Sequence, residues 1–124
     1  MVKDWPAMAA ELSGALKEVR GGAPEVMKGF SAIARAALEP KALDTRTKEL
    51  VALAIAVATR CDGCIAFHAE AAVRQGATRA EVLETMGMAI YMGAGPSVMY
   101  AAQAVEAFDQ FKAKASPVAA LPSR

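Results

Sequence analysis

The sequence contains few of the residues that usually carry chemistry or charge-driven binding. Among its 124 residues there are one histidine and two cysteines, and aromatic residues make up only 6%. Lys and Arg number 14 and Asp and Glu number 13, so the chain lacks the positive surplus that nucleic acid or an anionic membrane attracts. We therefore expect neither nucleic acid nor a membrane as a partner.

Long apolar runs are missing as well. The longest spans residues 50–58, nine residues, whereas a membrane-spanning helix needs about 20. Residues 1–12 lack the apolar core of a signal peptide. We therefore expect a cytoplasmic protein. In that reducing compartment a close pair of cysteines is more often catalytic or metal-binding than structural.

What the chain does have is an excess of apolar residues for its size. A length of 124 residues suffices for one domain with a core. Hydrophobic residues make up 55% of the chain, which is high for a small soluble domain. Contacts between copies of the chain would bury the apolar surface that a single domain leaves exposed, so we expect a homo-oligomer.

The local pattern indicates an all-α fold. Alternating strand patterns are absent, whereas helical spacing and helix-ending residues recur. We expect a compact bundle of about six helices in a single domain over residues 1–115, followed by a flexible tail at residues 116–124. The expected helices cover approximately residues 4–22, 24–40, 44–59, 61–76, 78–91 and 96–114.

Several residues mark the ends of these helices. Asp4 and Asp44 are N-cap candidates, and Thr78 with Glu81 forms the pattern of a capping box. Residues 93–96, Gly-Ala-Gly-Pro, predict a break before the last helix. The run 50–58 is apolar on all sides, so the third helix is expected to be the buried centre of the bundle.

Both cysteines and the single histidine fall within residues 61–68, Cys-Asp-Gly-Cys-Ile-Ala-Phe-His. On a helix, Cys61, Cys64 and His68 would lie within about 60° of one another, so they can face one pocket. The spacing puts the Cα atoms of the two cysteines roughly 5 Å apart on a helix, a separation that a disulfide tolerates. The pair can therefore alternate between dithiol and disulfide with little backbone movement.

Two features favour a reactive thiolate here. The segment opens a helix, whose N-terminal N–H groups stabilise negative charge. His68 follows Cys64 by one helical turn and can accept or relay the thiol proton. Glu49 precedes the apolar run, so its carboxylate is a candidate to be partly buried and to orient the imidazole. Considered alone, Glu49 would more commonly be a solvated helix residue.

Other interpretations of these residues are open. A lone CxxC is a weak signal. Structural zinc takes four ligands, and Cys61, Cys64, His68 and Glu49 would be an unusual set. Covalent haem attachment needs histidine directly after the second cysteine, where this chain has Ile65. The thioredoxin fold places its CxxC after a strand, and no strand is expected here.

The whole pattern is more specific than its parts. Glu49, Cys61, Cys64 and His68, at this spacing, resemble the signature of the alkyl hydroperoxidase D-like branch of the carboxymuconolactone decarboxylase family. The flanking residues 43–53 and 76–82 resemble that family's helix before the motif and its turn after the motif. The resemblance extends over roughly residues 24–111, most of the chain.

The resemblance implies an all-α fold assembled as homotrimers or homohexamers. We expect no cofactor and no metal. It also implies a thiol-dependent oxidoreductase, either a peroxidase or a disulfide reductase. By position, Cys64 would be the nucleophile and Cys61 its disulfide partner. His68 would be the base, and Glu49 the far end of the proton relay. The substrate would be a hydroperoxide or a disulfide, and a dithiol of the lipoamide or thioredoxin type would restore the enzyme.

Gly63 departs from the pattern, because well-studied alkyl hydroperoxidase D proteins have a second histidine at this position. We therefore expect a relative of unassigned substrate rather than the same enzyme. Two further functions are alternatives. One is a lyase of the carboxymuconolactone decarboxylase type, although those enzymes do not depend on a CxxC pair. The other is a non-catalytic redox sensor whose assembly responds to oxidation.

Overall fold

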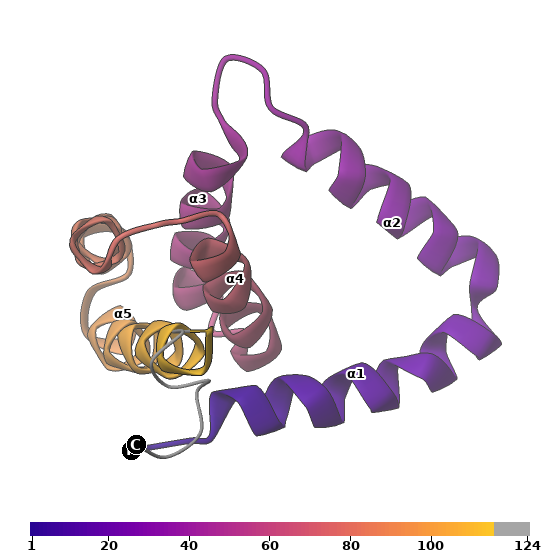
Figure 1. The fold of residues 1–124 in the computed structure, drawn as a ribbon, viewed down its shortest axis with the longest axis horizontal. Helices are drawn as coiled ribbons and strands as arrows, with labels where there is room; N and C mark the ends of the chain where they lie inside the picture. The colour runs from indigo at the N-terminus through magenta and orange to yellow at the C-terminus, as the bar shows by residue number, and fades with distance from the viewer. Residues whose placement is uncertain (116–124) are drawn as a thin grey trace, which may run out of the picture.

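The structure is a computed structural model that describes residues 1–115. The predicted flexible tail, residues 116–124, lies outside the described part. Within residues 1–115 the chain forms five helices and no strand, which confirms the predicted all-α class (Figure 1). The helices are α1 (Trp5–Gly22), α2 (Pro24–Leu38), α3 (Thr45–Ala58), α4 (Asp62–Arg74) and α5 (Arg79–Ala115).

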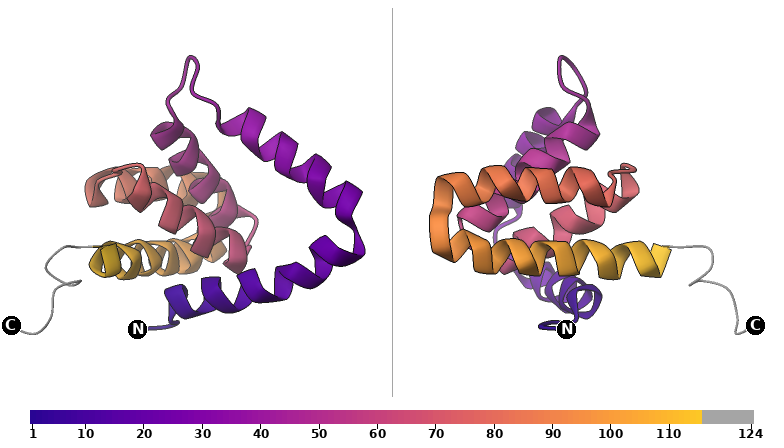
Figure 2. Two further views of the ribbon diagram at one scale, coloured as in Figure 1. Left: turned by 45° about the vertical axis from the view of Figure 1, so that its right-hand side comes forward. Right: turned by 90° about the vertical axis from the view of Figure 1, so that its left-hand side faces the viewer.

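Helix α5 contains the two helices that the sequence predicts after residue 78. Ala94 has non-helical backbone angles (φ 54°, ψ −141°), and Pro96 follows it. The right-hand view of Figure 2 shows the chain turning back here, so that the two arms of α5 run in opposite directions. A Cβ atom on Gly93 would lie 2.9 Å from the Cβ of Ser97, so the close approach of the chain at this bend requires glycine. The predicted break is confirmed.

The predicted N-caps are also present. The Asp4 side chain accepts a hydrogen bond from the backbone N–H of Ala7 (3.1 Å), and Asp44 accepts one from Thr47 (2.7 Å). Hydrogen bonds from Thr47 lower the pKa of Asp44. Before α5, the N–H of Thr78 donates to Glu81 Oε1 (2.8 Å) and the N–H of Glu81 donates to Thr78 Oγ1 (3.1 Å), a complete capping box.

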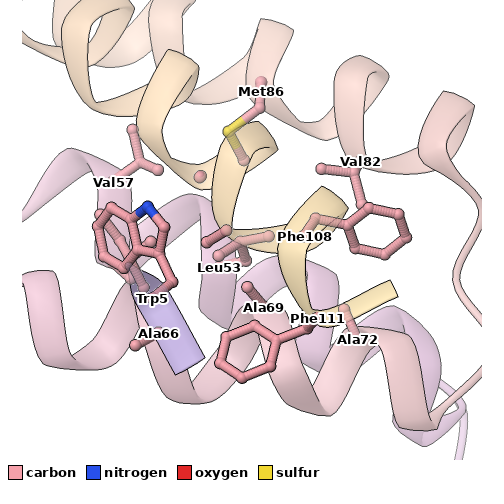
Figure 3. Close-up of a cluster of buried hydrophobic side chains, with 14 of the residues drawn as sticks. Trp5, Leu53, Val57, Ala66, Ala69, Ala72, Val82, Met86, Phe108 and Phe111 are labelled. Atoms are coloured by element: carbon pink, nitrogen blue, oxygen red, sulfur yellow. The ribbon is translucent and has the colours of Figure 1, made fainter. Parts of the chain in front are cut away.

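The core lies where α3, α4 and both arms of α5 meet the start of α1 (Figure 3). Helix α4 presents alanines to it, and Ala66, Ala69 and Ala72 have no exposed surface. Such small side chains let neighbouring helices approach closely. The larger side chains that fill the space between the helices include Trp5, Leu53, Val57, Val82, Met86, Phe108 and Phe111.

The start of the chain is held against the second arm of α5. The carboxylate of Glu106 accepts hydrogen bonds from the backbone N–H groups of Val2 (2.8 Å) and Lys3 (3.0 Å). These bonds, chiefly that from Lys3, lower the pKa of Glu106. Gln110 accepts from the N–H of Trp5 at 2.8 Å. These contacts seat the Trp5 ring in the core, where it is fully buried.

Helix α3 is central, but the expectation that residues 50–58 are buried on all sides is wrong. Leu53, Ala56 and Val57 are buried, whereas Val51 and Ile55 are 47% and 57% exposed. Only one face of α3 packs against α4 and α5. The other face is apolar and open, and it looks toward α2.

Helix α2 is the least embedded element. None of its residues is buried, although it has a continuous apolar face that includes Val26, Phe30 and Ile33. Figure 1 shows α1 and α2 as a V whose ends reach the other helices and whose corner, near Ala23, lies away from them. In the described part of the chain, no helix is both long and apolar enough to cross a membrane.

Candidate functional site

The cysteine pair lies at the first turn of α4. Cys61 is the N-cap residue, with extended backbone angles (φ −104°, ψ 99°), and its sulfur accepts a hydrogen bond from the N–H of Cys64 at 3.2 Å. Cys61 and Cys64 form a disulfide, with their Cα atoms 5.2 Å apart. This separation matches the value of roughly 5 Å expected from helix geometry. The sulfurs therefore occupy the position where the helix N-terminus stabilises negative charge.

Glu49 and His68, which lie on different helices, meet directly. His68 Nδ1 is 2.6 Å from Glu49 Oε1. The Glu49 residue is only 5% exposed, so the interpretation of Glu49 as a solvated helix residue is wrong. Because a carboxylate only accepts hydrogen bonds, this contact places the imidazole proton on Nδ1 and leaves Nε2 able to accept another.

The fold explains why Glu49 is buried. Glu49, Leu53 and Val57 follow one another at intervals of four residues, so they lie on the same face of α3. That face packs into the core, and all three residues are buried. The carboxylate is therefore carried into the interior by its helix, where the imidazole of His68 from α4 satisfies it.

Cys64 and His68 also share an opening to the surface. Both line a hollow of about 230 Å³, whose other walls come from the open face and the end of α3: Ala52, Ile55, Ala56 and Thr59. We call this space the thiol hollow. Cys61 is not among the residues that line it. A reactant in the thiol hollow would meet Cys64 and His68 together, while Glu49 backs the imidazole from the protein interior.

An ion pair that the sequence did not predict lies next to the cysteines. Asp62, between the two cysteines, pairs with the ammonium group of Lys3 from the start of the chain. The same ammonium lies 5.2 Å from the centre of the Trp5 ring. The positive charge of Lys3 offsets the negative charge of Asp62, which would otherwise disfavour a thiolate on Cys61 or Cys64. No local sequence signal connects Lys3 to Asp62, because 59 positions separate them.

Gly63 has a steric role in this structure. A Cβ atom on Gly63 would lie 2.6 Å from Cδ2 of Leu12 on α1. Helix α1 therefore crosses the start of α4 at the position where well-studied alkyl hydroperoxidase D proteins carry their second histidine. A histidine at position 63 would compete with Leu12 for the same space.

The geometry also shows how the four residues considered as zinc ligands are arranged. Of the four residues considered as ligands, Cys61 and Cys64 are joined in a disulfide, and Glu49 is hydrogen-bonded to His68. Within residues 1–115, no group of three or more His, Cys, Asp or Glu side chains is arranged to hold a metal ion.

Together, the fold and the site define a class: a helical bundle with a dithiol at the start of one helix and a carboxylate–imidazole pair beside it. Residues 24–107 match the sequence model of the carboxymuconolactone decarboxylase family, and the chain belongs to that family. The match runs from the start of α2 into the second arm of α5 and contains all four candidate site residues.

Solved structures agree with this assignment. A carboxymuconolactone decarboxylase family protein from Legionella pneumophila, solved in its apo form, is 51% identical, with a TM-score of 0.84 over 87% of this chain and 96% of that chain. A family member from Thermotoga maritima, for which a part in the antioxidative response has been suggested, is 28% identical, with a TM-score of 0.75 over 85% of this chain and 90% of that one.

A curated relative also extends over nearly the whole chain. An uncharacterized protein of Cupriavidus necator is 34% identical over 113 residues, which are 91% of this chain and all of that protein. The similarity thus reaches beyond the region of the family model.

Proposed function

We propose that the protein is a thiol-dependent oxidoreductase of the alkyl hydroperoxidase D-like type, which reduces a hydroperoxide with the Cys61/Cys64 dithiol. The observation that carries this proposal is the thiol hollow, which is lined both by Cys64 and by an imidazole that is paired with a buried carboxylate. A role in the antioxidative response has been suggested for the Thermotoga maritima relative, and such a role would be consistent with this chemistry.

The reaction starts from the reduced pair. His68 takes the Cys64 proton, and Glu49 compensates the positive charge that the imidazole gains. The Cys64 thiolate attacks the terminal oxygen of a hydroperoxide, ROOH, and the O–O bond breaks. Cys64 becomes a sulfenic acid, and the leaving alkoxide takes the proton from His68 to give ROH.

The Cys61 thiol then attacks the sulfenic sulfur. A disulfide forms and water leaves, so two thiols have been oxidised while ROOH has become ROH and water. A dithiol of the lipoamide or thioredoxin type reduces the disulfide by thiol exchange and is itself oxidised to a disulfide. Because this step needs a supply of reduced thiols, we place the protein in the cytoplasm.

The proposal is tested by peroxide consumption with purified protein. Turnover should require a dithiol reductant, and Cys64→Ser should abolish it. Cys61→Ser is the matched control, because it keeps the attacking thiol but loses the partner. Without reductant it should consume one equivalent of peroxide and stop at the Cys64 sulfenic acid, with no disulfide formed within the chain. Unchanged turnover in Cys64→Ser would end the hypothesis. Attack by Cys61 instead would show as the reverse pattern in the two variants.

We also propose that the protein works as a homo-oligomer, a trimer or a hexamer, formed through α2. Val26, Phe30 and Ile33 are 70%, 61% and 67% exposed on the apolar face of this helix, and such a contiguous patch is characteristic of an interface. Phe30→Asp should lower the mass observed in sedimentation velocity. Lys28→Asp on the polar face of α2 should leave it unchanged. Equal masses for the wild type and Phe30→Asp would contradict this interface.

A further inference from the structure

A second hollow adjoins the thiol hollow and has a different character. It measures about 380 Å³, within the range of roughly 300–1,000 Å³ that is usual for small-molecule sites. Its walls come from the end of α2 and the open face of α3, and we call it the α2–α3 groove. It is lined by Ala34, Ala37, Leu38, Leu43, Lys48, Val51, Ala52, Ile55 and His68.

The α2–α3 groove leads to the reactive groups. Ala52, Ile55 and His68 line both the groove and the thiol hollow, so the two spaces meet at the imidazole. A molecule with its reactive end beside Cys64 would therefore extend its remaining length between α2 and α3. The walls there are aliphatic and favour a hydrocarbon chain over a peroxide without one.

One positive charge lies on this apolar surface. Lys48 lines the groove, and its ammonium donates to the backbone carbonyl of Glu39 at 2.5 Å. An ammonium has three N–H donors, so this contact holds the group in place and leaves donors for a ligand. Within residues 1–115, no carboxylate lies within ion-pair distance of Lys48.

We propose that the α2–α3 groove binds the substrate, and that the substrate is a hydroperoxide of an apolar carboxylic acid, of the fatty-acid type. The hydrocarbon part lies against Leu38, Val51 and Ile55, and the carboxylate pairs with Lys48. The hydroperoxide lies beside Cys64 and His68. This assignment rests on the proposed function for the chemistry at Cys64, and it adds Lys48 as the residue that determines specificity.

The reaction balances as before. The hydroperoxy acid gains two electrons and becomes the hydroxy acid and water, and the Cys61/Cys64 dithiol becomes the disulfide. An uncharged dithiol such as dithiothreitol then restores the two thiols. Because this reductant carries no charge, any effect of Lys48 on turnover reports on the hydroperoxide.

The first experiment compares linoleic acid hydroperoxide with its methyl ester at neutral pH. The ratio of kcat/KM for the acid to kcat/KM for the ester should fall about threefold in Lys48→Met, which is the size expected for one partly exposed ion pair. Lys48→Arg should retain the ratio because it keeps the charge. Lys41→Met, in the loop between α2 and α3 but outside the groove, is the matched control and should also retain the ratio.

The second experiment measures binding without turnover. Cys64→Ser protein should bind decanoate in calorimetry, and adding Lys48→Met should weaken that binding about threefold. Methyl decanoate should bind the two proteins equally. Absence of decanoate binding, as expected if a second copy of the chain fills the groove, would overturn the inference. An equal effect of Lys48→Met on acid and ester would overturn it as well.

The two proposals fail in different ways. If the protein reduces hydroperoxides but Lys48→Met leaves the acid-to-ester ratio unchanged, the groove assignment is wrong and the thiol chemistry stands. If no hydroperoxide is reduced, the proposed function is wrong, and the calorimetry still decides whether the groove takes an apolar carboxylate.

Discussion

Replacement of Glu49 by glutamine separates the functional role of the buried carboxylate from a structural one. Glutamine has nearly the same shape, and its amide oxygen can still accept the Nδ1 proton of His68. What it lacks is the negative charge that faces the imidazole at 2.6 Å. The change therefore removes one electrostatic contribution from the site and leaves the packing of α3 in place.

The two roles predict different magnitudes. Proton transfer by a positioned base contributes about 10²–10⁴-fold to rate, so we expect kcat/KM for hydroperoxide to fall at least about 10²-fold. The free energy of unfolding should change by less than about 1 kcal/mol, because a neutral hydrogen bond replaces a charged one and glutamine costs less to bury. The His68 side chain, 34% exposed, remains accessible to water in the variant.

The assay pairs peroxide consumption under excess dithiol with urea unfolding of the same preparations. Alkylation of reduced protein by iodoacetamide at neutral pH adds a direct measure of thiolate, and it should slow for Cys64. Glu70→Gln is the matched control, since Glu70 lies on α4 close to His68 in sequence but pairs with Arg74 near the surface. The reasoning is refuted if Glu49→Gln keeps its rate, or if its rate falls no further than that of the control.

Three other outcomes follow from the packing and the ion contacts. Gly63→His should lower the melting temperature by displacing Leu12 and the α1 helix, whereas Gly63→Ala should cost less than about 1 kcal/mol because the Leu12 tip can shift. Glu106→Gln should destabilise the protein at pH 7, and the difference should disappear as the pH falls through the lowered pKa of Glu106, since a depressed carboxyl pKa stabilises only the ionised native state. Phe108→Ala, at a position 1% exposed, should cost about 3–5 kcal/mol in urea unfolding.

Controls make these three results decisive. Leu12→Ala should restore part of the stability lost in Gly63→His, and an unchanged loss in the double variant would show that α1 is not the obstacle. A Glu106→Gln difference that does not shrink as the pH is lowered through the acid range would show that the carboxylate charge is irrelevant. A cost below about 1 kcal/mol for Phe108→Ala would mean that the second arm of α5 is loosely packed.

The helix ends could be predicted from the sequence because the capping residues that determine them act locally. Asp4, Asp44 and the Thr78/Glu81 capping box act within three residues, and each is found where it was predicted. The bend at Ala94 likewise follows from neighbouring glycines and a proline. About six helices were expected, and α5 contains two of them, joined at the non-helical Ala94.

What could not be predicted depends on contacts between distant segments. The pattern of residues marked Glu49 as a candidate, but its burial against His68 depends on which face of α3 meets α4. The same question explains the error over residues 50–58, since an all-apolar run does not reveal which side the fold leaves open. The Lys3–Asp62 pair and the collision of Leu12 with any side chain at position 63 arise from α1 crossing α4.

The placement of the disulfide within one helical turn limits what oxidation can communicate. A Cα separation of 5.2 Å is what an ordinary helix start already provides, so the same backbone accommodates both redox states. A sensor needs two conformations that a partner can distinguish. Here oxidation joins two sulfurs within a single helical turn and requires little backbone change. A redox change confined in this way suits electron transfer through the proposed dithiol better than signalling by a change of shape.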